Sequence, residues 1–375
     1  MNDRERFLAT MRFGRPDRIP YWECAFWGET LERWVREGMP EAVLHPAGPE
    51  SWPTQESLRG YFGYDLSSGV YFRETASVNL GFIPPFEHKV LSEEDGVVTQ
   101  QDGEGVVFRW SHGGHSTRQF LRFPVQTQAD FREITRRLDP SSPGRVPEGW
   151  EKRPLEIQAA GAPICIQAGG YYGFARGLMG VENLSTAFYD QPELIEEIFE
   201  WRTAYVSAVL EKALALVKPD FAEFWEDMAF KTGPLVSPVL YRKLALKHYQ
   251  AITGLLRRHG VDLVLLDSDG NIDELIPIWL EGGINAIWPF EIAAGMDPLA
   301  VRAKYGRSLA IIGGIDKRAL AAGRAAIDRE VFPMVPKLIE SGGFIPTCDH
   351  AVPPDVSLAD YQYYLGLIHK IVEGR

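Results

Sequence analysis

A thiol, a carboxylate and an imidazole lie next to one another near the end of this sequence, at Cys348, Asp349 and His350. They follow an apolar run that predicts a buried strand, and Pro353 and Pro354 prevent further strand pairing. In folds of alternating strands and helices, active sites form where strands give way to loops. We therefore expect an enzyme. Because side chains alternate along a strand, Cys348 and His350 point away from Asp349, so the stretch supplies one wall of a shared cavity.

Two aspartates separated by one residue form a second cluster. Asp267 and Asp269 follow another apolar run, and residues two apart in extended backbone point the same way. Two close carboxylates repel unless a cation or a shared proton relieves them, so with Cys348 they are candidate metal ligands. Alternatively, Asp269 caps the next helix, Asp267 accepts backbone amides, and Cys348 is a small buried hydrophobe.

Acidic residues follow nearly every other predicted strand. Glu226 and Asp227 follow one, and with His350 they are our candidate catalytic residues for acid–base chemistry. A lone histidine is also commonly structural. The candidate substrate-binding residues at further strand ends are Glu23, Tyr172, Arg176 and Glu291. The Arg176 guanidinium can pair with a substrate carboxylate or, equally, hold a neighbouring acid.

The elements that must position these residues alternate from about residue 150 onward. Apolar runs predict strands at 164–168, 221–225, 263–266, 286–289, 309–312 and 344–347. Amphipathic runs predict helices at 182–216, 238–259, 271–282, 297–305, 325–341 and 357–373. Such alternation implies parallel βαβ units. An early strand at 19–25 brings the total close to eight, so we expect an α/β fold of the (β/α)8 TIM-barrel type.

The first third of the chain departs from this alternation. Helical spacing predicts a helix at 3–13, and residues 28–66 are helical and irregular. Between about 68 and 125, alternating runs separated by Asp-Gly turns predict an antiparallel β-meander. We therefore expect a single domain over residues 1–375, with an N-terminal helical segment and a β-meander insertion at about 68–125.

Composition narrows the class of protein. The 375 residues are 45% apolar and 24% charged, which is ordinary for a globular chain, and the net charge of -12 argues against nucleic-acid binding. The three cysteines are widely separated and odd in number, so no disulfide framework follows from them. Neither a signal peptide nor an apolar run of about 20 residues, long enough to cross a membrane, is visible. We expect a cytoplasmic protein that acts on a small molecule.

Three segments, 6–22, 313–317 and 349–354, resemble the uroporphyrinogen decarboxylase superfamily, and the similarity spans essentially the whole chain. The resemblance implies a (β/α)8 barrel, a possible homodimer, and one of two chemistries. One is cofactor-free decarboxylation of porphyrinogen acetate groups. The other is methyl transfer to or from a corrinoid by enzymes that use a thiolate-rich zinc site.

The resemblance is partial at the level of single residues. His350 falls where the decarboxylases place a substrate-contacting histidine, and Arg176 falls at the position of their pocket tyrosine. Their arginine-rich motif after the first strand is replaced by a segment containing Glu23, which makes uroporphyrinogen a poor substrate on charge grounds. In the methyltransferases the His-x-Cys zinc motif aligns with residues 267–269, and the third cysteine aligns with Cys348.

Three functions follow from these comparisons. The first is a methyltransferase or demethylase that moves a methyl group from a small methylated substrate to a corrinoid carried by a partner protein, with zinc possible at Asp267, Asp269 and Cys348. The second is a decarboxylase, without a cofactor, of a uroporphyrinogen-like or other acidic aromatic substrate in porphyrin metabolism. The third is a non-catalytic small-molecule binding protein on a barrel scaffold.

Overall fold

A parallel sheet of six strands forms the centre of the protein. The computed structural model describes residues 1–48, 51, 53–65, 69–111 and 118–374. The sheet has the strand order β12-β11-β10-β9-β6-β5. Its strands are β5 (Cys165–Gly169), β6 (Phe221–Trp225), β9 (Val264–Asp267), β10 (Ala286–Trp288), β11 (Ala310–Ile315) and β12 (Phe344–Cys348). The six strands predicted after residue 150 are thus confirmed to within a few residues, because continuous apolar runs suit a parallel sheet buried on both faces.

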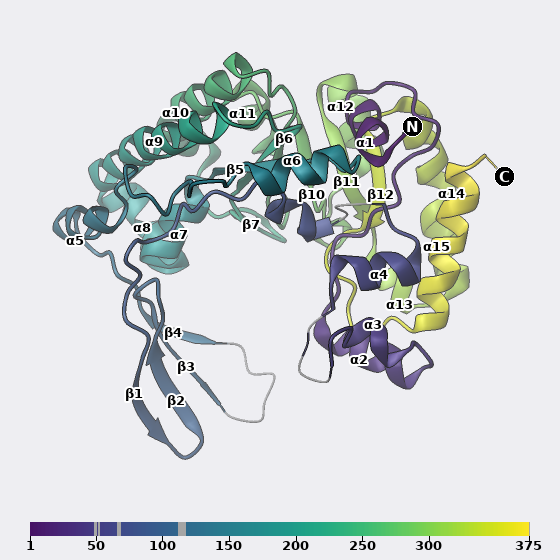
Figure 1. The fold of residues 1–375 in the computed structure, drawn as a ribbon, viewed down its shortest axis with the longest axis horizontal. Helices are drawn as coiled ribbons and strands as arrows, with labels where there is room; N and C mark the ends of the chain where they lie inside the picture. The colour runs from purple at the N-terminus through teal and green to yellow at the C-terminus, as the bar shows by residue number, and fades with distance from the viewer. Residues whose placement is uncertain (49–50, 52, 66–68, 112–117, 375) are drawn as a thin grey trace.

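Helices alternate with these strands and cover the sheet (Figure 1). They are α6 (Lys152–Ala159), α7 (Tyr172–Met179), α8 (Val181–Asp190), α9 (Pro192–Leu214), α10 (Pro238–Arg258), α11 (Ile276–Glu281), α12 (Pro298–Tyr305), α13 (Lys317–Ala321), α14 (Arg324–Ser341) and α15 (Leu358–Val372). The single helix predicted over 182–216 is two helices, because Pro192 starts α9 at its first turn. Among the residues described, no helix is both long and apolar enough to cross a membrane.

The two edges of the sheet are bordered by irregular chain. The strand predicted at 19–25 does not form; this segment meets the chain after β12 through a single parallel bridge between Phe26 and Val352. Pro20 has no N–H to give to a ladder, which weakens the segment as a strand. At the other edge, the Ala76 N–H donates to the Cys165 carbonyl of β5 at 3.1 Å. Within the described ranges, the sheet therefore has six strands.

The N-terminal segment is helical, as expected. It contains α1 (Asp3–Met11), α2 (Gly28–Arg36), α3 (Glu41–Leu44), α4 (Gln55–Phe62) and the 3-10 helix η1 (Gly69–Glu74). The meander comprises β1 (Lys89–Glu94), β2 (Val97–Gln101), β3 (Val107–Ser111) and β4 (Gln119–Arg122), and it projects from the rest of the protein (Figure 1). It starts later than predicted, because η1 occupies the first residues of the expected insertion. The short helix α5 (Gln128–Ile134) leads back toward the sheet.

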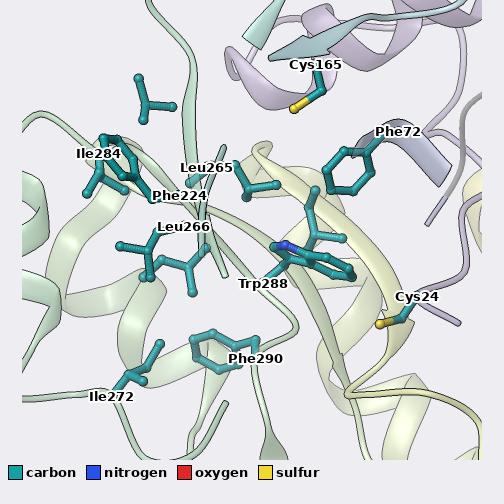
Figure 2. Packing of buried hydrophobic residues seen from close by; sticks show 14 of the residues in the cluster. Cys24, Phe72, Cys165, Phe224, Leu265, Leu266, Ile272, Ile284, Trp288 and Phe290 are labelled. Atoms are coloured by element: carbon teal, nitrogen blue, oxygen red, sulfur yellow. The ribbon is translucent and has the colours of Figure 1, made fainter. Parts of the chain in front are cut away.

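Aromatic side chains join the N-terminal segment to the sheet. Figure 2 shows Phe72 of η1 beside Trp288 of β10, with ring centroids 5.4 Å apart. Trp22 lies between Phe7 and Phe72, stacking on both rings at 4.8 and 5.6 Å. Phe7 and Phe72 also contact Phe221 at the start of β6, so this packing joins the N-terminal segment to β6 and β10.

Candidate active site

The carboxyl ends of β6, β9 and β12 carry most of the residues predicted to do chemistry. Because the strands are parallel, these ends meet at one edge of the sheet, and Asp267 at the end of β9 pairs in register with Trp225 at the end of β6. Around this edge the acids divide into two groups. One group lines an open pocket, and the other is buried in an inner wall.

A pocket of about 220 Å³ gathers several predicted site residues. Its lining includes Arg176, Asp227, Asp269 and Glu291. The fold therefore brings together four residues that the sequence analysis assigned to substrate binding, catalysis or metal binding. We call this the mouth pocket.

His350 forms an ion pair with Asp269, which lines the mouth pocket, whereas His350 itself is not among the lining residues. Its Nε2 lies 3.5 Å from Asp269 Oδ2, and both side chains are about one-third exposed. The hydrogen bond that the imidazole donates to Asp269 raises the pKa of His350, although burial and the Lys317 charge act in the opposite direction. The raised pKa favours the protonated imidazole, which can donate a hydrogen bond or a proton to a bound molecule. Asp269 therefore pairs with His350 and does not cap the next helix, α11, whose N-cap residue is Leu275.

Lys317 neutralises two acids on the same side of the pocket. Its Nζ lies 2.7 Å from Glu291 Oε1 and 3.8 Å from Asp349 Oδ1. Asp349 is fully buried and accepts backbone N–H bonds from Ile292 and Lys317 at 3.0 and 3.1 Å. Asp349 therefore positions the loops that carry Glu291 and Lys317, and the buried acid also attracts the lysine.

Arg176 pairs with Asp227 across the pocket. Its Nη1 donates to the Asp227 carboxylate and also to the Asp227 carbonyl, the latter at 2.8 Å. Asp227 has a φ of +44°, a left-handed conformation that is costly for a residue with a Cβ. Burial raises the pKa of Asp227, and the Arg176 charge opposes that rise. Of the two roles weighed for Arg176, the structure shows the pairing with a neighbouring acid.

The inner wall is organised around Arg73, a residue that the sequence analysis did not single out. Its Nε donates to Glu223 at 3.0 Å, and its Nη2 donates to Asp267. Glu223 also accepts the indole N–H of Trp288 at 2.9 Å. Burial raises the pKa values of both Glu223 and Asp267, and the guanidinium opposes each rise. Arg73 comes from η1, so only the tertiary fold brings it to the strand ends.

Glu226 and Tyr172 are enclosed behind the mouth pocket. Glu226 is fully buried, and its carboxylate accepts the N–H groups of Tyr171 and Gly173 and the hydroxyl of Tyr249. This arrangement holds the start of α7 and is typical of a positioning residue. Tyr172 is also buried, and its hydroxyl has no hydrogen-bond partner among the described residues. Neither side chain borders the mouth pocket.

Glu23 connects the first part of the chain to the end of β12. Its Oε1 accepts the N–H groups of Cys24 and Cys348 at 2.8 and 2.9 Å, and its Oε2 accepts the Tyr361 hydroxyl at 2.9 Å. Burial raises the pKa of Glu23 to about 7. Burial also raises the pKa of the Cys348 thiol well above its ordinary value, so this cysteine is held as a neutral thiol.

The predicted metal ligands are not arranged as a ligand set. Asp267 bonds to the Arg73 guanidinium, Asp269 pairs with His350, and Cys348 is a fully buried thiol. Across the described part of the chain, no group of three or more His, Cys, Asp or Glu side chains is placed to hold a metal ion. A zinc ion requires deprotonated donors that converge on one point, so this donor set does not fit it.

Sequence reasoning missed Arg73 and Lys317 as site residues. Lys317 lies directly after β11, within the Gly-Gly-Ile-Asp-Lys segment, so its place at a strand end was a signal that could have been used. Arg73 lies in η1, outside the alternating strands and helices, so its sequence position did not indicate a place at a strand end.

Comparisons with known proteins agree with this architecture. The family model described as uroporphyrinogen decarboxylase (URO-D) matches residues 121–371. The solved structure of a methyltransferase from Methanosarcina mazei superposes with a TM-score of 0.58, covering 99% of each chain, at 13% sequence identity, so the likeness is one of fold. The comparison with curated protein sequences gives no match. The chain belongs to the uroporphyrinogen decarboxylase (URO-D) family.

Proposed function

We propose that this protein is a methyltransferase that moves a methyl group from a small methoxylated compound to a corrinoid carried by a partner protein. The observation that carries the proposal is the His350–Asp269 pair, 3.5 Å apart at the mouth pocket, with a raised pKa on the imidazole. The similarity in fold to a methyltransferase adds support.

Methyl transfer from an oxygen requires a proton donor in the protein. When the bond between the methyl carbon and oxygen breaks, the bonding electron pair stays on the oxygen, which leaves as an anion unless a proton arrives. The corrinoid supplies the nucleophile that takes the methyl group. His350 donates its Nε2 proton to the leaving oxygen, and Asp269 stabilises the imidazolium before that transfer. A positioned acid of this kind typically contributes about 100- to 10,000-fold to the rate.

The ion pairs at the pocket support an uncharged reacting group, and the exposed Lys231 of the lining adds one further positive charge. The acids Asp227 and Glu291 are neutralised by Arg176 and Lys317, and His350 is neutralised by Asp269. A substrate bearing many carboxylates, such as uroporphyrinogen, would compete with these pairs for their cations. A methoxy oxygen accepts a hydrogen bond without disturbing them.

The proposed scaffold is a closed (β/α)8 barrel. The edge contacts of residues 76 and 26 support it, since they place irregular chain where two further barrel positions would lie. In such a barrel, the carboxyl ends of the strands form the active-site face. This agrees with the position of the mouth pocket.

A direct test uses free cob(I)alamin as the methyl acceptor and methanol, anisole and guaiacol as separate donors. We expect the wild type to transfer a methyl group from at least one donor, and His350→Ala to lose this transfer. The absorbance of the cobalamin measures the reaction. A matched control is His369→Ala, since His369 stacks on Tyr21 with centroids 3.9 Å apart, away from the pocket. Absence of transfer from every donor, together with CO2 release from an acidic aromatic substrate, contradicts the proposal. Metal analysis of the same purified protein shows whether zinc binds through a rearranged site.

Decarboxylation of an acidic aromatic substrate is the second candidate. The observation that favours it is a neighbouring cavity of about 370 Å³, whose lining includes Arg73 and Arg202 together with aromatic side chains. In that reaction the bond to the carboxylate carbon breaks, CO2 leaves, and a proton takes its place on the substrate carbon. The CO2 measurement above distinguishes this candidate from methyl transfer.

A further inference from the structure

The neighbouring cavity contains a buried cation without an anionic partner. Arg202, on α9, is 5% exposed, and no carboxylate in the described part of the chain lies within 4.0 Å of its guanidinium. Its Nε and Nη1 have no hydrogen-bond acceptor among the described residues. Unmet donors of a buried charge cost several kcal/mol, roughly, so a natural chain rarely keeps them without a partner.

The closest contacts of the Arg202 guanidinium are with aromatic faces, while the more distant Glu226 carboxylate favours its charge and Arg145 opposes it. Its Cζ lies 4.1 Å from the ring centroid of Phe174 and 5.7 Å from that of Tyr205. Such cation–π contacts supply no hydrogen-bond acceptor, so Nε and Nη1 stay without one among the described residues. Burial lowers the pKa of Arg202 to about 10, which still leaves the guanidinium charged at neutral pH.

The guanidinium borders the cavity directly. Arg202 and Gly169 both line it, and a Cβ on Gly169 would lie 3.0 Å from Arg202 Nη2. Glycine at this position, with a φ of +88°, therefore leaves the space in front of the guanidinium open. Phe174 and Trp225 line the same cavity and supply flat apolar surface.

We propose that this cavity binds a small organic acid, with the carboxylate on Arg202 and the apolar body against Phe174 and Trp225. An arginine presents paired N–H donors that match the two oxygens of a carboxylate. The arginines that grip propionate groups in the decarboxylases follow the first strand, whereas Arg202 lies on α9, so this site is separate from theirs. It goes beyond the proposed function and holds whichever reaction takes place at the mouth pocket.

The charges around Arg202 set limits on the ligand. Arg73 lines the cavity but is already paired with Glu223 and Asp267, so it adds little net positive charge. Glu104 also lines the cavity, and its side chain is exposed. Partial desolvation of its carboxylate raises the pKa of Glu104. One carboxylate is therefore matched to the available cation, and a second carboxylate would face Glu104.

The test uses benzoate as the probe and benzamide as its uncharged analogue of similar shape. By titration calorimetry, we expect benzoate to bind the wild type at least tenfold more tightly than benzamide. Arg202→Gln weakens benzoate at least tenfold, and Arg202→Lys restores part of the loss. Arg302→Gln is the matched control, because Arg302 is also a partly buried arginine but bonds to backbone carbonyls away from this cavity.

Two further measurements keep the result clear. The melting temperature of Arg202→Gln stays equal or rises if Arg202 is kept for a ligand, and it falls if the residue is structural. On the wild type, benzoate shifts the NMR resonance of the Arg202 Nε–H, assigned with Arg202→Lys, even if the glutamine variant does not fold. Equal binding of benzoate and benzamide, or unchanged benzoate binding by folded Arg202→Gln, overturns the proposal. None of these measurements depends on methyl transfer, so this site and the proposed reaction fail or succeed separately.

Discussion

The acids at the strand ends of this protein behave as two different populations. In the mouth pocket, Asp269 is about one-third exposed and meets His350. In the inner wall, Glu23, Glu223 and Glu226 are almost completely buried and bonded to backbone amides, tyrosines, an indole and a guanidinium. The same residue types therefore lie at an open pocket in one place and in a hydrogen-bonded interior in the other. Burial and hydrogen-bond partners distinguish the two roles.

The largest expected effect comes from removing the proton donor at the mouth. His350→Ala lowers the rate of methyl transfer by about 100- to 10,000-fold. The free energy of unfolding changes little, since the side chain is one-third exposed. Rates with cob(I)alamin and urea denaturation of the same sample check both parts. If His350→Ala lost as much unfolding free energy as an inner-wall variant, the two regions would not differ in the way proposed.

The next effect comes from removing the cation of the inner wall. Arg73→Met leaves Glu223 and Asp267 buried without their guanidinium, and we expect a loss of about 3–5 kcal/mol in unfolding free energy. The control is Arg242→Ala at an exposed ion pair with Glu281, for which the loss is about 1 kcal/mol or less. Denaturant titration measures both. Equal losses in the two variants would show that the inner wall is not held by its charges.

Glu23 gives the inner wall a pH dependence. Because its pKa is raised from 4.5 to about 7, the folded protein keeps a proton that the unfolded chain loses in this range. The stabilisation from this group is complete below about pH 4.5 and is lost as the pH rises to about 7, by up to about 3 kcal/mol. Glu23→Gln removes this part of the decline in unfolding free energy. Glu32→Gln, at an exposed position, leaves the pH profile unchanged.

The smallest effect is a shift in the pH profile of the mouth. Asp269 is the main cause of the raised pKa of His350, so Asp269→Asn lowers that pKa toward 6.5. Because the protonated imidazole is the acid, the rate of the variant falls at a lower pH than the rate of the wild type. Asp273→Asn, at an exposed pair with Lys304, is the control. Identical pH–rate profiles for the wild type and both variants would show that His350 is not the proton donor.

Much of the sheet could be predicted from the sequence, because the buried strands β6, β9 and β12 are continuous apolar runs and Asp267 and Cys348 mark two of their ends. The acids could be found by the same reasoning, yet their separation into two regions could not. Glu226 and Asp227 are neighbours in sequence, and only the packing of α7 above them makes one structural and leaves the other at the pocket. Arg73 depends on a contact between segments nearly two hundred residues apart, which no local pattern reveals.

The start of α7 has a consequence for how this protein can change over evolution. A Cβ on Gly170 or Gly173 would lie 2.0 or 2.5 Å from the Trp225 carbonyl oxygen, so neither position can accept a larger residue unless the helix moves. Arg176 of the same helix borders the mouth pocket, whereas Gly173 borders the neighbouring cavity that Arg202 lines. The helix is thus a common partition, and any mutation that displaces it reshapes both chambers at once. New specificities in this lineage should therefore arise through side chains facing one chamber, while the two glycines stay constant.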